Sequence, residues 1–325
     1  MIAGMVLMAT FFSCEEMNER VLPRASGKSG ELLVVIDSTY WNGSTGDAIR
    51  EVFSQTQEGL PQQEALFDII HLPHRSFAQI FKTNRNIIIV EVKEDSKNKL
   101  SINSDVWSKQ QLIVSIAAPS PKIAAETIQK NGEALLDYFN SKENDRLQLK
   151  YLENEANPVS KQMKSQFHLQ MRIDNLYTIA KRADDFLWVR KEKKVGEHPV
   201  SQGLFIYTYP YTSDSTFNVV NLVNKRNEFT KKYVQGSAEG TYMATYEEYT
   251  PKQKEVNINS LYAKELRGLW RVEGDFMGGP FINYTMVDEK RNLVISMDGY
   301  VYAPRFDKRE YLRELEALIR SVQIK

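Results

Sequence analysis

The chain has 325 residues, with 42 basic and 42 acidic side chains and a formal net charge of zero. This balance argues against a protein that binds nucleic acid, because neutralising phosphates requires a net-basic face. Hydrophobic residues make up 42% of the chain and charged residues 26%, values typical of a globular protein rather than of a disordered one.

The first thirteen residues, Met1–Ser13, carry no charge and predict a secretory signal peptide. The run Met5–Phe12 is almost wholly apolar. About a dozen apolar residues form a helix about 18 Å long, well short of the ~30 Å hydrocarbon core of a bilayer. The cationic start typical of such signals is missing, which leaves open a translation start upstream of Met1.

The only cysteine, Cys14, directly follows this run and indicates lipidation. Its position after Ser13 resembles a bacterial lipobox, although Phe11 stands where Leu is usual. A lone cysteine has no intramolecular disulfide partner, which excludes a disulfide-stapled fold. The alternative interpretation is a buried free thiol. We expect Cys14 to carry the membrane anchor, with palmitate among its acyl groups.

Residues 14–30 are polar and turn-rich, which predicts a flexible tether between the membrane and the folded part. Glu15 and Glu16 resemble the surface-export signal of Bacteroides-type lipoproteins, and they fit a solvated tether equally well. We therefore expect an outer-membrane lipoprotein of the cell envelope. Whether it faces the periplasm or the cell surface stays open.

Residues 31–150 predict an N-terminal α+β domain. Apolar runs bounded by turn residues predict buried strands at 31–37, 67–72, 86–92 and 106–116. Ser44 is predicted to cap a helix over residues 46–53. A long helix is predicted over residues 122–140, and Gly132 in its middle indicates a kink or a close packing contact.

Residues 160–325 predict a C-terminal α+β domain, because the charged segment 141–160 marks a boundary. Strands are predicted at 167–173, 186–190, 204–209, 269–276, 281–287 and 293–302. Helices are predicted over residues 216–234 and at the C-terminus, where Asp307 and Glu310 stand at capping-box spacing.

The predicted elements give an α+β fold class. We expect two layered α/β sandwich-like units with mostly antiparallel sheets, each ending in an amphipathic helix. Residues 112–139 and 293–322 share the order strand, Pro-containing turn and amphipathic helix. This likeness is too weak to identify an internal repeat.

The glycine-rich segment 267–281 is the best candidate for a functional loop. Its Gly-Gly-Pro sequence permits a sharp turn or a close approach of the backbone to a ligand. The candidate functional residues are Trp270, Asp275, Gly278 and Gly279. A tight hairpin without a functional role is the alternative interpretation.

Acidic residues in the second half are candidates for a hydrolytic pair: Glu273, Asp275, Asp288 and Asp298. Two carboxylates flanking a sugar can hydrolyse a glycosidic bond, but their spacing is spatial and the sequence does not fix it. We favour ordinary polar strand faces and turns, because the sequence lacks nucleophile signatures such as Gly-x-Ser-x-Gly.

His71 and His74 could offer two imidazoles to a metal, but Pro73 bends the chain between them and no third ligand is evident. We therefore expect no metal and no cofactor.

Two tyrosine-rich stretches, 207–211 and 242–249, are interpreted as ordinary strands, with stacking on sugars or peptides as the alternative. Two Asp-Ser-Thr triplets resemble the O-glycosylation acceptor of Bacteroides-type bacteria. They make Ser38 and Ser215 candidate glycosylation sites at expected loop positions.

Several segments together resemble a lipoprotein family of unknown function from Bacteroides-type bacteria. They are Gly30–Asp37, Trp41–Asn42, Leu60–Gln62, His71–His74 and Gly274–Pro280. The resemblance covers nearly the whole chain after Cys14. It implies an envelope lipoprotein and supplies no activity, ligand or catalytic residue beyond the lipid-bearing cysteine.

The favoured function is a non-enzymatic binding or scaffolding role at the envelope, with a membrane anchor and a protein or glycan partner. A hydrolase of envelope or dietary polymers, using carboxylates such as Glu273 and Asp275, is the alternative. A structural component of a larger envelope complex is a third hypothesis.

Overall fold

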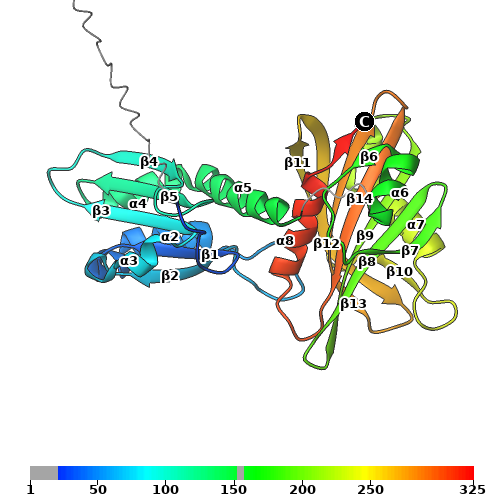
Figure 1. Cartoon of the computed structure of the whole chain (residues 1–325), viewed down its shortest axis with the longest axis horizontal. Helices are drawn as coiled ribbons and strands as arrows, with labels where there is room; N and C mark the ends of the chain where they lie inside the picture. The colour runs from blue at the N-terminus through cyan, green and yellow to red at the C-terminus, as the bar shows by residue number, and fades with distance from the viewer. Residues whose placement is uncertain (1–20, 152–156) are drawn as a thin grey trace, which may run out of the picture.

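Two β-sheets set beside each other along the long axis organise the molecule (Figure 1). The computed structural model describes residues 21–151, here called the first unit, and residues 157–325, the second unit. The expected signal peptide and Cys14 lie outside the described residues. Helices α5 (Gly132–Lys150) and α8 (Arg309–Arg320) pack where the two units meet.

The first unit is built on a five-stranded sheet with the order β2-β1-β3-β5-β4. Its strands are β1 (Glu31–Val35), β2 (Asp68–Leu72), β3 (Asn86–Val92), β4 (Lys99–Ser104) and β5 (Leu112–Ala118). The neighbours β2-β1, β1-β3 and β3-β5 are parallel, and only β4 is antiparallel. Parallel strands are covered on both faces, which explains the unbroken apolar runs in this part of the sequence.

Helices cover one face of this sheet more fully than the other. Phe53, Ile128 and Phe139 belong to the larger core, beneath α2 (Ser44–Phe53), α4 (Pro121–Lys130) and α5. The opposite face has a smaller apolar cluster, in which Phe81 and Trp107 pack over the strands. Short elements complete the unit: α1 (Ser38–Trp41), η1 (His74–Ser76) and α3 (Gln79–Lys82).

Three local predictions for the first unit were wrong. The strand expected over 106–116 begins only at Leu112, because the preceding loop turns through residues with left-handed backbone angles. Ser44 lies inside the first turn of α2 and does not cap it. The long helix expected over 122–140 is two helices. The break precedes Gly132, where a Cβ atom would lie 2.8 Å from Val52 Cγ2.

The second unit is an eight-stranded antiparallel sheet with the order β10-β12-β13-β14-β9-β8-β7, and β11 also pairs with β12. Its strands are β7 (Thr178–Ala183), β8 (Phe186–Val195), β9 (His198–Pro210), β10 (Tyr242–Thr245), β11 (Lys252–Ile258), β12 (Leu261–Glu273), β13 (Gly278–Asp288) and β14 (Leu293–Tyr302). Alternate residues of a strand face opposite sides. Leu204 and Ile206 therefore pack under α8 and α6 (Pro158–Gln162), whereas Phe205 and Tyr207 pack under α7 (Val219–Tyr233).

The expected strand over 167–173 exists only as β6 (Leu169–Gln170), which pairs with β15 (Gln323–Ile324). Before it lies the helical turn η2 (Met163–Phe167), and His168 takes a left-handed conformation with φ 56°. The side chains predicted to share a face are nevertheless all buried in one core: Phe167, Leu169, Met171 and Ile173. The helix predicted over 216–234 begins at Val219, after the turn η3 (Asp214–Phe217).

The predicted capping box at Asp307 and Glu310 was wrong. Helix α8 begins at Arg309, and its cap residue Lys308 makes no side-chain capping bond. The α+β fold class is confirmed, with antiparallel pairing dominant because the second sheet is the larger. The parallel pairing of the first sheet is the departure from the expected arrangement.

Candidate functional site

A cleft of about 900 Å³ opens between the two units. The first unit contributes helix α5 and the loop residues 55–58, and the second unit contributes β11, β12 and α8. Figure 1 shows α5 and α8 near the centre of the molecule, with β11 and β12 beside α8. Hollows between units are a frequent location of ligand sites, and this one has the size of a small-molecule or peptide-segment site.

The α5 side of the cleft is acidic. Leu135 and Phe139 anchor α5 in the first core, and Asp137 and Tyr138 between them are exposed. Glu133, Asp137 and Asp145 are exposed lining residues, and none forms an ion pair with another described residue. Positions 133 and 137 are four residues apart and therefore lie on one helix face. This wall, which we call the acidic wall, holds carboxylates that no ion pair within residues 21–151 and 157–325 neutralises.

The opposite side of the cleft, which we call the floor, is charged but internally paired. Arg267 on β12 donates to Glu265 at 2.5 Å and to Glu316 of α8 at 2.8 Å. The Tyr284 hydroxyl on β13 lies 2.6 Å from the Glu265 carboxylate and 3.1 Å from that of Glu316. Arg320 completes the group, 3.9 Å from Glu316.

Burial and charge act in opposite directions on the floor carboxylates. Burial opposes ionisation of Glu316, but the guanidinium groups of Arg267 and Arg320 outweigh it and hold the pKa of this carboxyl below its usual range. Burial raises the pKa of the Tyr284 hydroxyl well above its usual value, and the adjacent carboxylates add to that shift. Glu316 is therefore ionised and Tyr284 neutral near neutral pH.

Next to the cleft, hydrogen bonds and ion pairs join the two units in a contact that we call the seam. The Glu64 carboxylate of the first unit accepts the backbone N–H groups of Lys308 and Arg309 at 2.7 and 2.8 Å. It therefore caps the N-terminus of α8, in place of the capping box predicted within the helix. Arg309 also pairs with Asp68 at 2.7 Å, and Arg313 donates to the Leu66 carbonyl at 2.6 Å.

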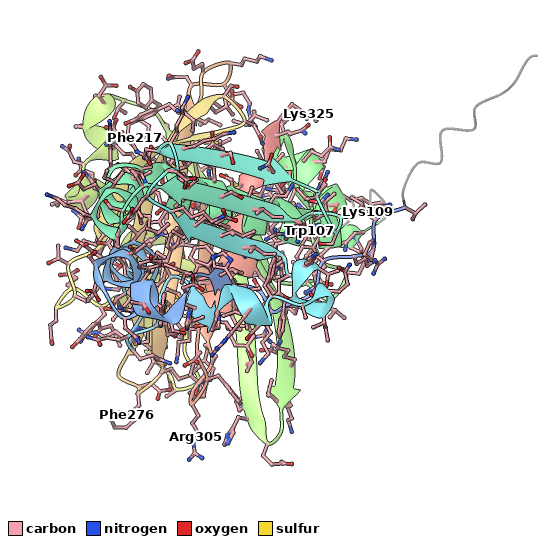
Figure 2. All side chains as sticks on the ribbon, turned by 90° about the vertical axis from the view of Figure 1, so that its left-hand side faces the viewer. Trp107, Lys109, Phe217, Phe276, Arg305 and Lys325 are labelled. Atoms are coloured by element: carbon pink, nitrogen blue, oxygen red, sulfur yellow. The ribbon has the colours of Figure 1, made fainter. Side chains whose placement is uncertain are left out.

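The candidate loop residues lie away from this cleft, in the β12–β13 hairpin. Trp270 is buried, and its indole N–H donates to the Val301 carbonyl at 3.2 Å. Gly278 and Gly279 are strand residues of β13, and Asp275 sits in the turn and accepts from Ser237 at 3.2 Å. The fully exposed Phe276, which the sequence analysis did not single out, forms the tip of this hairpin (Figure 2).

The acidic candidates for a hydrolytic pair have separate surroundings. Glu273 pairs with Arg271 at 2.7 Å, and Asp288 pairs with Arg291 at 2.6 Å. Asp298 is fully buried and accepts from Arg226 at 2.8 Å. Burial raises the pKa of Asp298 even though Arg226 opposes the shift. None of these residues lines the cleft.

The remaining motifs have local partners. His71 and His74 donate to the carbonyls of Ile36 and Val90 at 2.9 and 2.8 Å. Among the described residues, no group of three His, Cys, Asp or Glu side chains has an arrangement suited to a metal ion. Tyr207 and Tyr209 are buried strand residues, whereas Tyr211 is half-buried.

The candidate glycosylation positions are both exposed, Ser38 in α1 and Ser215 in η3. In the part of the chain that the structure describes, no helix is both long and apolar enough to cross a membrane.

A family model described as "Domain of unknown function (DUF4837)" matches residues 156–321, just over half of the chain. The chain belongs to this family. A second model, "Domain of unknown function (DUF8532)", matches residues 25–152, so the segment before the DUF4837 domain has a family description of its own. No curated protein matches the chain.

Two solved structures are distantly similar to this DUF4837 protein. The Ran-binding protein Mog1p of Saccharomyces cerevisiae is 7% identical, with a TM-score of 0.30 over 48% of this chain and 90% of that chain. The human StarD13 lipid transfer and protein localization domain is 10% identical, with a TM-score of 0.18 over 53% of this chain and 98% of that chain. Neither value carries an argument about fold or function.

Sequence reasoning missed the cleft because its walls come from distant segments. Glu133 and Asp137 were part of a predicted helix, and their spacing was the available signal for a one-sided acidic face. Nothing in the sequence connects these two acidic residues with Arg267, because they line one cleft only after both units have folded.

Proposed function

We propose that this DUF4837 protein is a lipid-anchored protein of the cell envelope, attached through Cys14, whose cleft binds a cationic peptide segment of a partner protein without catalysis. The observation that carries the binding role is the contrast between the unpaired carboxylates of the acidic wall and the internally paired floor. Eight acidic and four basic side chains line the cleft, which leaves an excess of negative charge. Such a field attracts a cationic segment.

The exposed carboxylates of the cleft also favour a ligand rich in N–H donors. A Lys ammonium or an Arg guanidinium can pair with Glu133, Asp137 and Asp145, which are exposed lining residues.

The lining favours a peptide over a glycan. No Phe, Tyr or Trp is among the described lining residues, whereas sugar-binding sites commonly stack rings on aromatic faces. The hydrolase alternative gains no support, because the acidic candidates occupy separate ion pairs or the β12–β13 turn. The envelope location rests on the sequence, through the apolar run before Cys14.

Binding is tested with a fluorescent Lys/Arg-rich decapeptide and a Glu-rich decapeptide of the same length. We expect the basic peptide to bind and the acidic one not to bind. The double variant Glu133→Lys/Asp137→Lys should weaken binding about tenfold at low salt, because it reverses the wall. The matched control Glu197→Lys/Glu289→Lys changes the net charge equally at exposed turns away from the cleft. Equal weakening by both variants would refute the cleft as the site.

The anchor is tested separately by metabolic labelling with a palmitate analogue. We expect label on the wild-type protein and none on Cys14→Ala. Protease shaving of intact cells then separates surface display from a periplasmic orientation. If Cys14→Ala stays labelled, the lipidation site is wrong and the cleft proposal is unaffected.

A further inference from the structure

Three segments of the first unit meet where the described chain begins. The Lys109 backbone N–H donates to the Pro23 carbonyl at 2.8 Å, and the Ser26 N–H donates to the Thr83 carbonyl at 2.9 Å. Residues 23–26, which the sequence places in a flexible tether, are therefore held against the ends of α3 and of the loop before β5. The point at which the chain leaves the first unit is fixed close to Val21.

The surface at this point combines exposed apolar side chains with cations. Ile80 and Val21 are 75% and 84% exposed, far more than apolar side chains that serve a core. The Lys82 ammonium lies 5.6 Å from the centre of the half-buried Trp107 ring. We define the tether-exit patch as Val21, Arg24, Ile80, Lys82, Trp107 and Lys109. In Figure 2, Trp107 and Lys109 lie on the side of the molecule where the described chain begins.

This composition matches a surface that contacts lipid headgroups. Apolar and Trp side chains enter the boundary between headgroups and acyl chains, while Lys and Arg extend to anionic headgroups. Single exposed apolar residues need no explanation, but here Val21 lies three residues before Arg24, and Ile80 shares helix α3 with Lys82. Asp105 is the acidic residue of the adjoining loop, and one of its carboxylate oxygens accepts the Gln111 N–H at 3.1 Å.

The length of chain before the patch identifies the bilayer as the occupant. Val21 is seven residues after Cys14, and seven fully extended residues span at most about 25 Å. A lipid on Cys14 therefore keeps the patch within that distance of the membrane. We propose that the tether-exit patch rests on the bilayer and binds anionic headgroups, which fixes the orientation of the first unit at the membrane. This inference rests on the proposed attachment through Cys14.

The experiment uses the full lipidated protein in phosphatidylcholine vesicles, with and without phosphatidylglycerol, and an amine-labelling reagent that does not cross membranes. Labelling is compared with that of the same protein in nonionic detergent. We expect Lys82 and Lys109 to lose about fivefold in labelling on the anionic vesicles, the factor that corresponds to the ~1 kcal/mol attraction of one Lys to such a surface. Lys254 and Lys290 are exposed on the second unit and should label equally in all conditions.

Variants separate lipid contact from anchoring. In Lys109→Glu, labelling of Lys82 on anionic vesicles should rise toward the detergent value, whereas the matched variant Lys290→Glu should leave it protected. If the protein binds the anionic vesicles and none of the four lysines is labelled less there than in detergent, the patch proposal is wrong and the anchor proposal is unaffected. A protein that does not stay with the vesicles would overturn the anchor and the patch together.

Discussion

The seam and the cleft join the same two units in opposite ways. At the seam, the first turn of α8 meets the first unit through a buried carboxylate that satisfies two backbone N–H groups. Further along the same helix, Glu316 and Arg320 border open space opposite α5. The seam therefore fixes how the units are placed, and the cleft is the gap that this placement leaves.

Charged side chains at the seam and on the floor have protein partners, whereas those of the acidic wall do not among the described residues. Arg309 and Arg313 at the seam have protein partners, and so does Arg267 on the floor of the cleft. The acidic wall has none among the described residues. Removing one partner of a buried ion pair is costly, because the other charge stays buried without a partner. Removing an exposed charge that has no partner costs little. The comparison thus predicts large stability effects at the seam and floor, and small ones on the wall.

A substitution in the floor should cause the largest loss in the free energy of unfolding. Arg267→Ala removes the partner shared by Glu265 and Glu316 and leaves two carboxylates crowded in a largely buried site. We expect a loss of about 3 kcal/mol in the free energy of unfolding, measured by urea denaturation. Lys254→Ala, on the exposed rim of the same cleft, should change it by less than ~0.5 kcal/mol. Similar values for the two variants would show that the floor network is not structural.

The seam should give the next largest effect. Glu64→Ala removes the cap of α8, with an expected loss of about 2 kcal/mol. Glu64→Gln keeps one carbonyl oxygen and should recover part of that loss. Hydrogen exchange of the first turn of α8 should accelerate in both variants, because the capped N–H groups become free. Unchanged exchange there would mean that Glu64 does not hold the helix end.

Acid should weaken the floor in a defined direction. The pKa of Glu316 is lower in the folded protein than its ordinary value of 4.5, so its ionised form contributes stability above that pH. That contribution is lost as the pH falls through the folded pKa. The difference in unfolding free energy between wild type and Glu316→Gln should therefore be full near pH 7 and shrink below pH 4.5. A difference that grows on acidification would reverse the assigned sign.

Strands with strong apolar signals were predictable from the sequence. The strand predicted over 293–302 matches β14, and the stripe of the C-terminal helix packs on the second sheet. Among the missed strands, β4 and β11 are mostly exposed or half-buried, and each has only two alternating apolar residues, Leu100 and Ile102 in β4 and Val256 and Ile258 in β11, which is too short a pattern to indicate a strand. Their strand pairing is supplied by neighbours, β5 and β12, rather than by their own patterns.

The cap of α8 shows why the seam was not predictable. Asp307 and Glu310 have capping-box spacing, yet the bond comes from Glu64, 244 residues earlier in the chain than Lys308. A local pattern records only what neighbours in the sequence can do. Contacts between the units depend on how the two cores are placed relative to each other, and residue spacing in the sequence does not predict that placement.

A substitution on the acidic wall should change the free energy of unfolding least, and any change should be a gain rather than a loss. Glu133 and Asp137 are like charges four residues apart on α5, which repel each other by about 0.2–0.5 kcal/mol. Asp137→Asn, which keeps Glu133 in the first turn of α5 where a carboxylate interacts favourably with the helix dipole, should therefore leave the free energy of unfolding unchanged or raise it slightly. Salt should remove the gain because it screens exposed charges. A loss above ~1 kcal/mol would show that the Asp137 carboxylate has a partner in the folded protein. The wall would then belong with the floor, and the distinction between a structural and a binding side of the cleft would fail.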